Sequence, residues 1–395
     1  MPLCTEKSVA KHNQIASFIT YKVKKSFKTA FLYIGTAIGA GFSSGREIAL
    51  FFGDASPLNV ALSSVFMAML ACLFLTAGKL GLIPKGKLLR LLILFSASIS
   101  LVAMLAGGEY IMHSMTTIPM LALVMALCGA FVVAQGIEKI KVVNLILVPL
   151  IVLSIALIFF QIPMQNGSTS FSILKPIMYS GLDILLGGVI VGEEGKDMTF
   201  KEILLASTLI VIFLFAMLFM LQTIVLYDTN DSLMPVFAIS KALHLQAICG
   251  ILIASAIFTT LVSSLKIVSD ILIDFLAGVK KLSPLSRPDN KSIVVLFCLL
   301  IAYPLSLFGF KKIVGTMYPI NSVLGVLLAF VVLVRLIIHG VLKLKTKKQK
   351  SLRKTAEAKH KIKVQSSSSS LFGGLKYSSK GERLESSSTS SSPLR

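Results

Sequence analysis

Two apolar stretches of the sequence contain residues that could bind a small solute or an ion. Residues 35–47 carry four glycines and end in the adjacent pair Arg46 and Glu47, and residues 179–188 carry three glycines around Asp183. A charged side chain at the centre of a bilayer costs about 2.5–3.5 kcal/mol even on a lenient insertion scale, so its presence there points to a function. Glycine lets the backbone leave the helix, and unwound backbone at membrane depth occurs only where it faces protein or a wet cavity. We therefore interpret both stretches as helix interruptions that face a binding site.

A third stretch, residues 256–264, is rich in hydroxyl side chains. Thr259 and Ser263 are four residues apart, as are Thr260 and Ser264, so each pair shares a helix face. Hydroxyl and carbonyl oxygens are the ligands that hard cations prefer, and this face could bind Na⁺. The alternative is that the hydroxyls donate to carbonyls one turn back in their own helix.

These three stretches must be positioned by membrane helices. The 395-residue chain is 55% hydrophobic and 14% charged, with a formal net charge of +21 and a mean hydropathy of +0.85, whereas a soluble domain is roughly 25% charged. This composition excludes a soluble enzyme, a secreted disulfide scaffold and a nucleic-acid-binding module. Runs of about 20 apolar residues can cross the hydrocarbon core as helices. The sequence predicts an all-α polytopic membrane protein with ten transmembrane helices, at residues 29–53, 57–82, 88–110, 118–136, 140–162, 172–194, 200–227, 244–276, 291–309 and 314–341.

The distribution of Lys and Arg predicts the orientation of these spans. They concentrate near both ends of the chain and in alternate connections, which places both termini in the cytoplasm by the positive-inside rule. The first and sixth spans then enter the membrane from opposite sides. Two glycine-interrupted spans at corresponding positions of oppositely oriented halves indicate a 5+5 inverted repeat, as in many secondary transporters.

The composition also predicts three parts of the chain. Residues 1–28 form a basic cytoplasmic segment, and residues 29–341 form the transmembrane domain, with repeats at about 29–162 and 172–341. Residues 342–395 form a basic, Ser-rich tail, which we expect to be disordered because it cannot bury enough apolar surface. The expected location is the cell membrane, as a multi-pass protein, and the cytoplasmic membrane if the source is bacterial.

Two other interpretations of the first stretch stay open. Its glycines, spaced four apart, also match small-residue motifs that pack membrane helices together. In addition, residues 41–45 match G-x-S-x-G, the nucleophile motif of hydrolases, with Ser43 as the nucleophile. That motif requires a strand before it and a helix after it.

The first span resembles that of the YkvI-like bacterial membrane proteins. Residues 35–48 read G-T-A-I-G-A-G-F-S-S-G-R-E-I and are followed by Phe51 and Phe52. The family pattern is G-T-x-x-G-A-G-F-A-[ST]-G-x-E-I followed by F-F, and residues 310–325 are also similar to the family. The resemblance covers about residues 28–340. It implies the amino acid–polyamine–organocation superfamily with the LeuT-type fold.

The same resemblance implies a cation site. LeuT-type sodium symporters carry G-N-A-V-G-L-G in the first span and A-x-x-T-S in the eighth, which are similar to residues 35–41 and 256–260. The match implies that the cation ligands are Gly35, Ile38, Ala256, Thr259 and Thr260. Thr36 stands where the symporters have Asn. Asp183 lies where YkvI-like proteins often carry Y-x-x-Y-N, and a carboxylate there could favour proton coupling.

Together these patterns predict a cation-coupled secondary transporter, not an enzyme, that moves a small solute by alternating access. The solute is expected to be an amino acid or a related amine. The coupling ion is Na⁺ or H⁺, and no cofactor, other metal or nucleic acid is expected. The predicted substrate-binding residues are Thr36, Gly39, Gly41, Tyr179, Ser180 and Asp183. Arg46 and Glu47 are predicted to form part of an outer gate, with Glu109 as a candidate partner of Arg46.

Two further classes of protein are compatible with the sequence. A non-transporting membrane receptor on the same fold would bind a nutrient at the central site and pass the signal to its tail. An intramembrane serine protease would use Ser43, but His113 and His244 both lie near predicted outer ends of spans rather than at matching depth.

Overall fold

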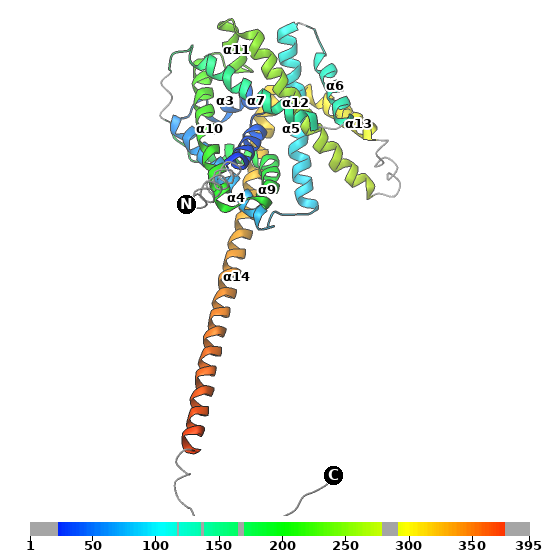
Figure 1. Cartoon of the computed structure of the whole chain (residues 1–395). Helices are drawn as coiled ribbons and strands as arrows, with labels where there is room; N and C mark the ends of the chain where they lie inside the picture. The colour runs from blue at the N-terminus through cyan, green and yellow to red at the C-terminus, as the bar shows by residue number, and fades with distance from the viewer. Residues whose placement is uncertain (1–22, 117, 136–137, 165–169, 279–290, 376–395) are drawn as a thin grey trace, which may run out of the picture. The chain divides into compact units, whose positions relative to one another are not determined.

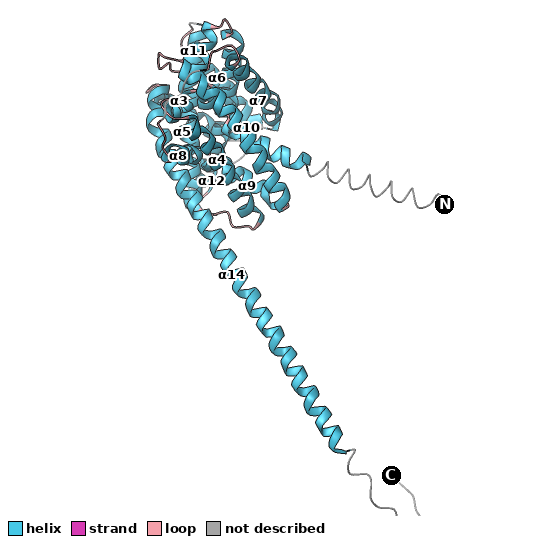
Figure 2. Ribbon diagram, turned by 90° about the vertical axis from the view of Figure 1, so that its left-hand side faces the viewer, coloured by secondary structure: helices cyan, strands magenta, loops and turns pink. Residues whose placement is uncertain are grey.

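The computed structural model describes residues 23–116, 118–135, 138–164, 170–278 and 291–375. Within these ranges every regular element is helical (Figure 2). The first described element is a helix over residues 23–37. The later helices are α2 Ala40–Ser43, α3 Arg46–Phe52, α4 Pro57–Lys79, α5 Lys87–Thr116, α6 Leu121–Gln135, α7 Glu138–Phe159, α8 Leu174–Leu182, the π-helix η1 Ile184–Gly188, α9 Val189–Glu194, the 3₁₀-helix η2 Gly195–Asp197, α10 Phe200–Tyr227, α11 Pro235–Ala242, α12 Gln246–Ala277, α13 Lys291–Ser306 and α14 Phe310–Leu375.

Among the described residues, five helices are long and apolar enough to cross a bilayer, as expected of a polytopic membrane protein. They are α4, α5, α10, α12 and the part of α14 from Phe310 to Lys350. Shorter apolar helices cover α6, Ile146–Phe159 within α7, and α13. The two remaining predicted spans correspond to the interrupted segments described below. The number of ten spans, the inverted repeat and the cytoplasmic position of both ends stay predictions.

Local sequence signals explain where two of the long helices begin. Before α10, the hydroxyl of Thr199 accepts from the Glu202 N–H at 3.4 Å, and the Glu202 carboxylate accepts from the Thr199 N–H at 2.7 Å. This reciprocal capping box satisfies two N–H groups that the first helical turn leaves without partners. Before α4, the hydroxyl of Ser56 accepts from the Leu58 N–H at 3.3 Å, and Pro57 occupies the first helical position. Proline suits that position because its fixed φ matches the helix.

Helix packing places the interrupted segments inside the protein. In Figure 1, α12 packs along α5 and α10 packs along α4. Helix α4 also contacts α8, η1 and α9, whereas α12 contacts α2. Among the largest fully buried side chains are Tyr33, Phe42 and Tyr179, which lie in or beside the two interrupted segments. Large apolar side chains such as Phe131 and Phe330 are exposed on the outer helix faces, which suits lipid contact.

The chain divides into two units, residues 1–335 and 336–395. In the second unit the described residues 336–375 are helical, as the C-terminal part of α14. This corrects the expectation of disorder from residue 342 as far as residue 375. Between Gly340 and Gly373 the sequence has neither glycine nor proline and contains nine Lys and four Leu, which are good helix formers. Residues 376–395, and residues 1–22 of the predicted N-terminal segment, lie outside the described residues.

Candidate functional site

The first interruption lies where the glycine-rich sequence predicted it. Residues 38 and 39 are not helical, α2 follows for one turn, and a second turn at Ser44 and Gly45 precedes α3. Gly45 has a φ of 79°, a left-handed conformation that glycine adopts without strain. At the break, the Gly39 N–H donates to the Ala37 carbonyl at 2.9 Å. In a regular helix that N–H would donate to Gly35, so the Gly35 carbonyl loses its helical donor.

The second interruption surrounds Asp183. Helix α8 ends at Leu182, Asp183 is a turn residue, and η1 follows as a π-helix before α9 resumes α-helical geometry. π-helical turns inside α-helices are rare and frequently occur at functional sites. Among the described residues Asp183 Oδ2 is buried without a hydrogen-bond partner. The predicted irregularity of the sixth span is therefore present in the structure.

The two interruptions pack directly against each other. A β-carbon built on Gly187 would lie 2.7 Å from Thr36 Oγ1, so only glycine allows this approach. The Thr36 hydroxyl is held in place because it donates to the Tyr33 carbonyl at 2.7 Å. On the other side of the first interruption, a β-carbon on Gly39 would lie 3.9 Å from Thr260 Cγ2. The structure thus brings the three chemically unusual stretches of the sequence together.

Glu47 lies inside the protein beside the second interruption. Its residue surface is 5% exposed, and a β-carbon added to Gly41 would overlap its carboxylate, so the side chain folds back onto Gly41. Glu47 lies on α3, which contacts α8, and Asp183 directly follows the end of α8. Glu47 Oε2, like Asp183 Oδ2, has no hydrogen-bond partner among the described residues. Glu47 was expected in an outer gate with Arg46; the structure instead places its carboxylate in the central site, because α3 turns it inward.

Aromatic and amide side chains complete the surroundings of the two carboxylates. Tyr179 is fully buried, with its ring edge-on to Phe51 at 5.4 Å and to Phe52 at 5.0 Å between ring centroids. Tyr318, from α14, is also buried. Asn321 donates from Nδ2 to the Leu182 carbonyl at 3.1 Å, while its Oδ1 is buried without a described partner.

Asn321 and Tyr318 were not among the predicted site residues. Both lie on α14, about 140 residues from Asp183 along the chain, so no local motif links them to it. A polar amide within an apolar span is the signal that could have identified Asn321, since such residues mark functional positions in membranes.

The hydroxyl residues of the predicted cation site are partly engaged within their own helix. Thr259 donates to the Ala256 carbonyl at 3.1 Å, and Ser263 donates to the Thr259 carbonyl at 2.9 Å. These bonds within the helix are the ones that the structural alternative to a cation site predicts. Each hydroxyl oxygen can still accept a hydrogen bond or coordinate a cation. Helix α12 contacts α2, so Ala256, Thr259 and Thr260 lie on the helix that borders the first interruption.

The structure does not support a hydrolase nucleophile at Ser43. A helix over residues 23–37 precedes the motif, where the nucleophile motif needs a strand. Ser180, predicted to bind substrate, is buried and donates to the Ile177 carbonyl of its own helix at 2.8 Å.

An ion-pair network lies at the start of α3. Arg46 Nη1 is 2.9 Å from Asp231 Oδ1, and Lys311 Nζ is 2.6 Å from Asp231 Oδ2. Asp231 therefore connects the first interruption to the beginning of α14. Glu109 is not the partner of Arg46; it accepts from the N–H groups of Met120 and Ala122 and so caps α6. Loop geometry brought Asp231 to Arg46, and the sequence carries no signal for that pairing.

The pKa of Asp231 predicts a pH dependence of stability. Hydrogen bonds from Lys311 and then Arg46 lower the pKa of the Asp231 carboxyl below its ordinary value. A lowered folded-state pKa stabilises the fold above the unfolded pKa of about 3.9, and the contribution is lost as the pH falls through the folded value. We therefore expect wild type to have a higher melting temperature than Asp231→Asn at pH 7, and the two to converge below about pH 4. The check is thermal unfolding across this range, with Asn230→Ala as a control from the same loop; a difference that persists at low pH would contradict the assignment.

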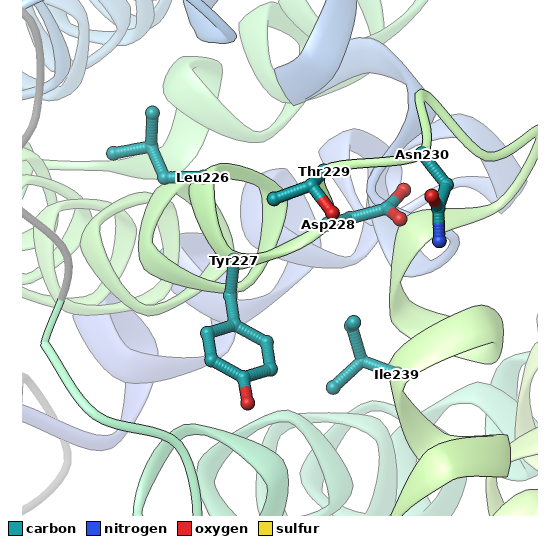
Figure 3. Close-up of a pocket in the computed structure, with 6 residues that line it drawn as sticks. All are labelled: Leu226, Tyr227, Asp228, Thr229, Asn230 and Ile239. Atoms are coloured by element: carbon teal, nitrogen blue, oxygen red, sulfur yellow. The ribbon is translucent and has the colours of Figure 1, made fainter.

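The loop that carries Asp231, between α10 and α11, borders a pocket that is separate from the central site. The pocket lies between the end of α10 and α11 (Figure 3), and its lining residues are Leu226, Tyr227, Asp228, Thr229, Asn230 and Ile239. The Asp228 carboxylate accepts from both the N–H and the hydroxyl of Ser232, each at 2.9 Å. The Asp228 carboxylate therefore binds within its own loop and stabilises the segment that carries Asp231.

Comparisons with known proteins agree with a membrane protein of the predicted kind. No family model matches the sequence. The uncharacterized membrane protein YkvI of Bacillus subtilis (strain 168) is 22% identical over 333 residues, which cover 74% of this chain and 90% of that protein. The uncharacterized protein YyaD of the same strain is 26% identical over 351 residues, covering 81% of this chain and 98% of YyaD. The resemblance to YkvI-like membrane proteins, predicted from the first span, is thereby confirmed.

Solved structures show a weaker likeness. A crystal structure of the Eremococcus coleocola manganese transporter, in complex with an aromatic bis-isothiourea compound, matches with 13% sequence identity and a TM-score of 0.43. The match covers 79% of this chain and 86% of that transporter. A likeness at this level assigns no substrate.

Proposed function

We propose that this protein is a cation-coupled secondary transporter that moves a small solute, an amino acid or a related amine, by alternating access. One observation carries the proposal. Two interrupted helices, far apart in the sequence, pack directly against each other at their interruptions, beside two buried carboxylate oxygens, Glu47 Oε2 and Asp183 Oδ2, that have no described partner. Interrupted membrane helices of this kind supply the substrate and ion sites of many secondary transporters. Burying a polar oxygen without a hydrogen bond is costly, and a bound ligand would offset that cost.

The substrate would bind between the two interruptions. Thr36, Gly39 and Gly41 would line the site from the first segment, and Tyr179, Ser180 and Asp183 from the second. Gly187 fixes how closely these segments approach. The site would be open to one side of the membrane at a time, and movement of one segment against the other would exchange the open side.

The coupling ion would bind beside the first interruption. The Gly35 carbonyl has lost its helical donor and is available to a cation, and Ile38 lies at the break itself. Ala256, Thr259 and Thr260 would contribute oxygens from α12, which contacts α2. Binding of the ion would hold α12 and the first interruption together, and in this way couple the ion gradient to the movement.

The ion pairs of Asp231 would act as the gate at the predicted outer end. They connect Arg46, which follows the first interruption, to Lys311 at the start of α14. Opening the site at this end would require at least one of these pairs to separate. Asp231 and Lys311 are exposed, whereas Arg46 is buried. An exposed pair such as Lys311–Asp231 contributes only about 0.2–1 kcal/mol, which suits a contact that must break in every transport cycle.

Uptake of amino acids and amines into vesicles, with and without a Na⁺ gradient, tests the coupling. The double variant Thr259→Ala with Thr260→Ala is expected to lose Na⁺-dependent uptake, because two of the coordinating hydroxyls are gone. Thr208→Ala is the matched control, since its hydroxyl bonds the Leu204 carbonyl on an exposed face of α10. If the double variant keeps Na⁺-dependent uptake, the cation assignment is wrong.

A further inference from the structure

We propose that Glu47 and Asp183 together bind the ammonium group of the substrate, so that the site selects a primary amine with net positive charge over a zwitterionic amino acid. This inference rests on the proposed function and narrows its substrate class. It assigns Glu47 to substrate binding and adds Asn321 to the binding site.

The site holds two carboxylates without an ion pair. Glu47 lies on α3, which contacts α8, and Asp183 directly follows α8. In the part of the chain that the structure describes, neither carboxylate is in an ion pair. Arg46, the nearest basic residue in the sequence, directs its guanidinium to Asp231 and the Ser232 carbonyl. A buried carboxylate without a cation carries an effective penalty of several kcal/mol. A positively charged ligand removes this penalty, whereas a ligand without net charge offsets only part of it.

The site offers acceptors for an ammonium group. Glu47 Oε2, Asp183 Oδ2, Asn321 Oδ1 and the Tyr179 hydroxyl oxygen are buried and lack a described hydrogen-bond partner. A primary ammonium group has three N–H donors and no acceptor. Three of these oxygens are enough in number to accept from one ammonium group. Asn321 is fixed next to Asp183 because its Nδ2 bonds the Leu182 carbonyl at 3.1 Å.

The aromatic surroundings of the site suit an organic amine. Tyr179 packs edge-on against Phe51 and Phe52, and Tyr33 and Tyr318 are also buried. Aromatic rings attract organic cations and pack against their apolar parts.

The first interruption has no room for a substrate carboxylate beside Gly41. Gly39 and Gly41 were predicted to bind the substrate. A β-carbon on Gly41 would overlap Glu47 Oε1, so a carboxylate of the protein already occupies this side of the interruption. A second carboxylate, from a substrate, would be repelled there. The site therefore discriminates against amino acids by charge.

Matched ligand pairs test the inference on the purified full-length protein. Each amino acid is compared with the amine that lacks only its carboxylate: leucine with isopentylamine, tyrosine with tyramine, and lysine with 1,5-diaminopentane. Thermal unfolding reports binding, because a ligand that binds only the native state raises the melting temperature. We expect at least one amine to stabilise the wild-type protein and its amino acid to bind at least tenfold more weakly. Equal or tighter binding of the amino acids, or no binding of any amine, would overturn the inference.

Variants identify the groups involved. Glu47→Gln and Asp183→Asn are each expected to weaken amine binding at least tenfold, whereas Asp54→Asn, an exposed carboxylate paired with Lys175, should leave it unchanged. Unchanged binding in both site variants would also overturn the inference. If either variant fails to fold, the comparison of amine with amino acid on the wild-type protein still decides. Ion-driven uptake of amino acids but not amines would refute this inference and leave the proposed function intact, whereas amine binding without any uptake would refute the transporter.

Discussion

Gly325→Ala is expected to destabilise the protein by about 3 kcal/mol, the upper end of the usual range for overpacked sites. Gly325 of α14 lies against Gly181 of α8, and a β-carbon on Gly325 would overlap the Gly181 carbonyl oxygen. The obstacle is backbone, which cannot move aside as the end of a flexible side chain can. Because Gly181 is close to Asp183 and Gly325 is close to Asn321 in sequence, the substitution would also displace both from the central site.

Gly315→Ala is the matched control, since it makes the same change in the same helix. A β-carbon on Gly315 meets no atom within 4 Å. Alanine there is expected to leave stability unchanged or raise it by about 0.5–1 kcal/mol through helix propensity. Thermal unfolding of both variants in detergent makes the comparison. Equal melting temperatures for the two variants would show that α8 and α14 are not in contact at Gly181.

Gly187→Ala is expected to reduce transport at least tenfold, because it forces the two helix interruptions apart. Its β-carbon would lie 2.7 Å from Thr36 Oγ1 and 3.6 Å from the Tyr33 ring, so Thr36 has to shift. Displacements of about 1 Å in a positioned site can cost as much as a hundredfold in rate. The expected loss of stability is about 1–3 kcal/mol.

A double-mutant cycle identifies the contact responsible. Thr36→Ala removes the hydroxyl that Gly187→Ala would strike, so the double variant should regain most of the lost stability. Residues in direct contact show such non-additive effects, whereas independent sites add. Melting temperatures of the wild type, both single variants and the double variant give the coupling free energy between positions 36 and 187. If the two effects simply add, Thr36 and Gly187 are not in contact, and the direct packing of the two helix interruptions is refuted.

The sequence predicted the interruptions because their cause is local. Clustered glycines at residues 35–45 and a carboxylate with glycines at 179–188 are incompatible with regular, lipid-facing helix. The structure breaks both helices at these positions. The relation of the chain to YkvI-like membrane proteins was also predictable, since the first-span motif is continuous in sequence.

The partners across the site were not predictable in the same way. Whether Glu47 points to a gate or to Asp183 depends on how α3 is turned after Gly45, which adjacent residues do not specify. Asn321 and Asp231 come from segments far along the chain, and only tertiary packing brings them to Leu182 and Arg46. The tail was predicted to be disordered from residue 342 because of its Lys and Ser content, whereas α14 continues to Leu375 through a stretch without glycine or proline between Gly340 and Gly373.

Counterflow in proteoliposomes tests the central claim most directly. Vesicles containing the purified protein are loaded with an unlabelled amine that stabilises it, and entry of the labelled amine is measured without an imposed ion gradient. A transporter exchanges the two, so labelled amine is expected to accumulate transiently with wild-type protein and not with Asp183→Asn. Binding of the amine by the wild-type protein without any counterflow would contradict the proposal, because a receptor on the same fold binds its ligand but does not carry it across.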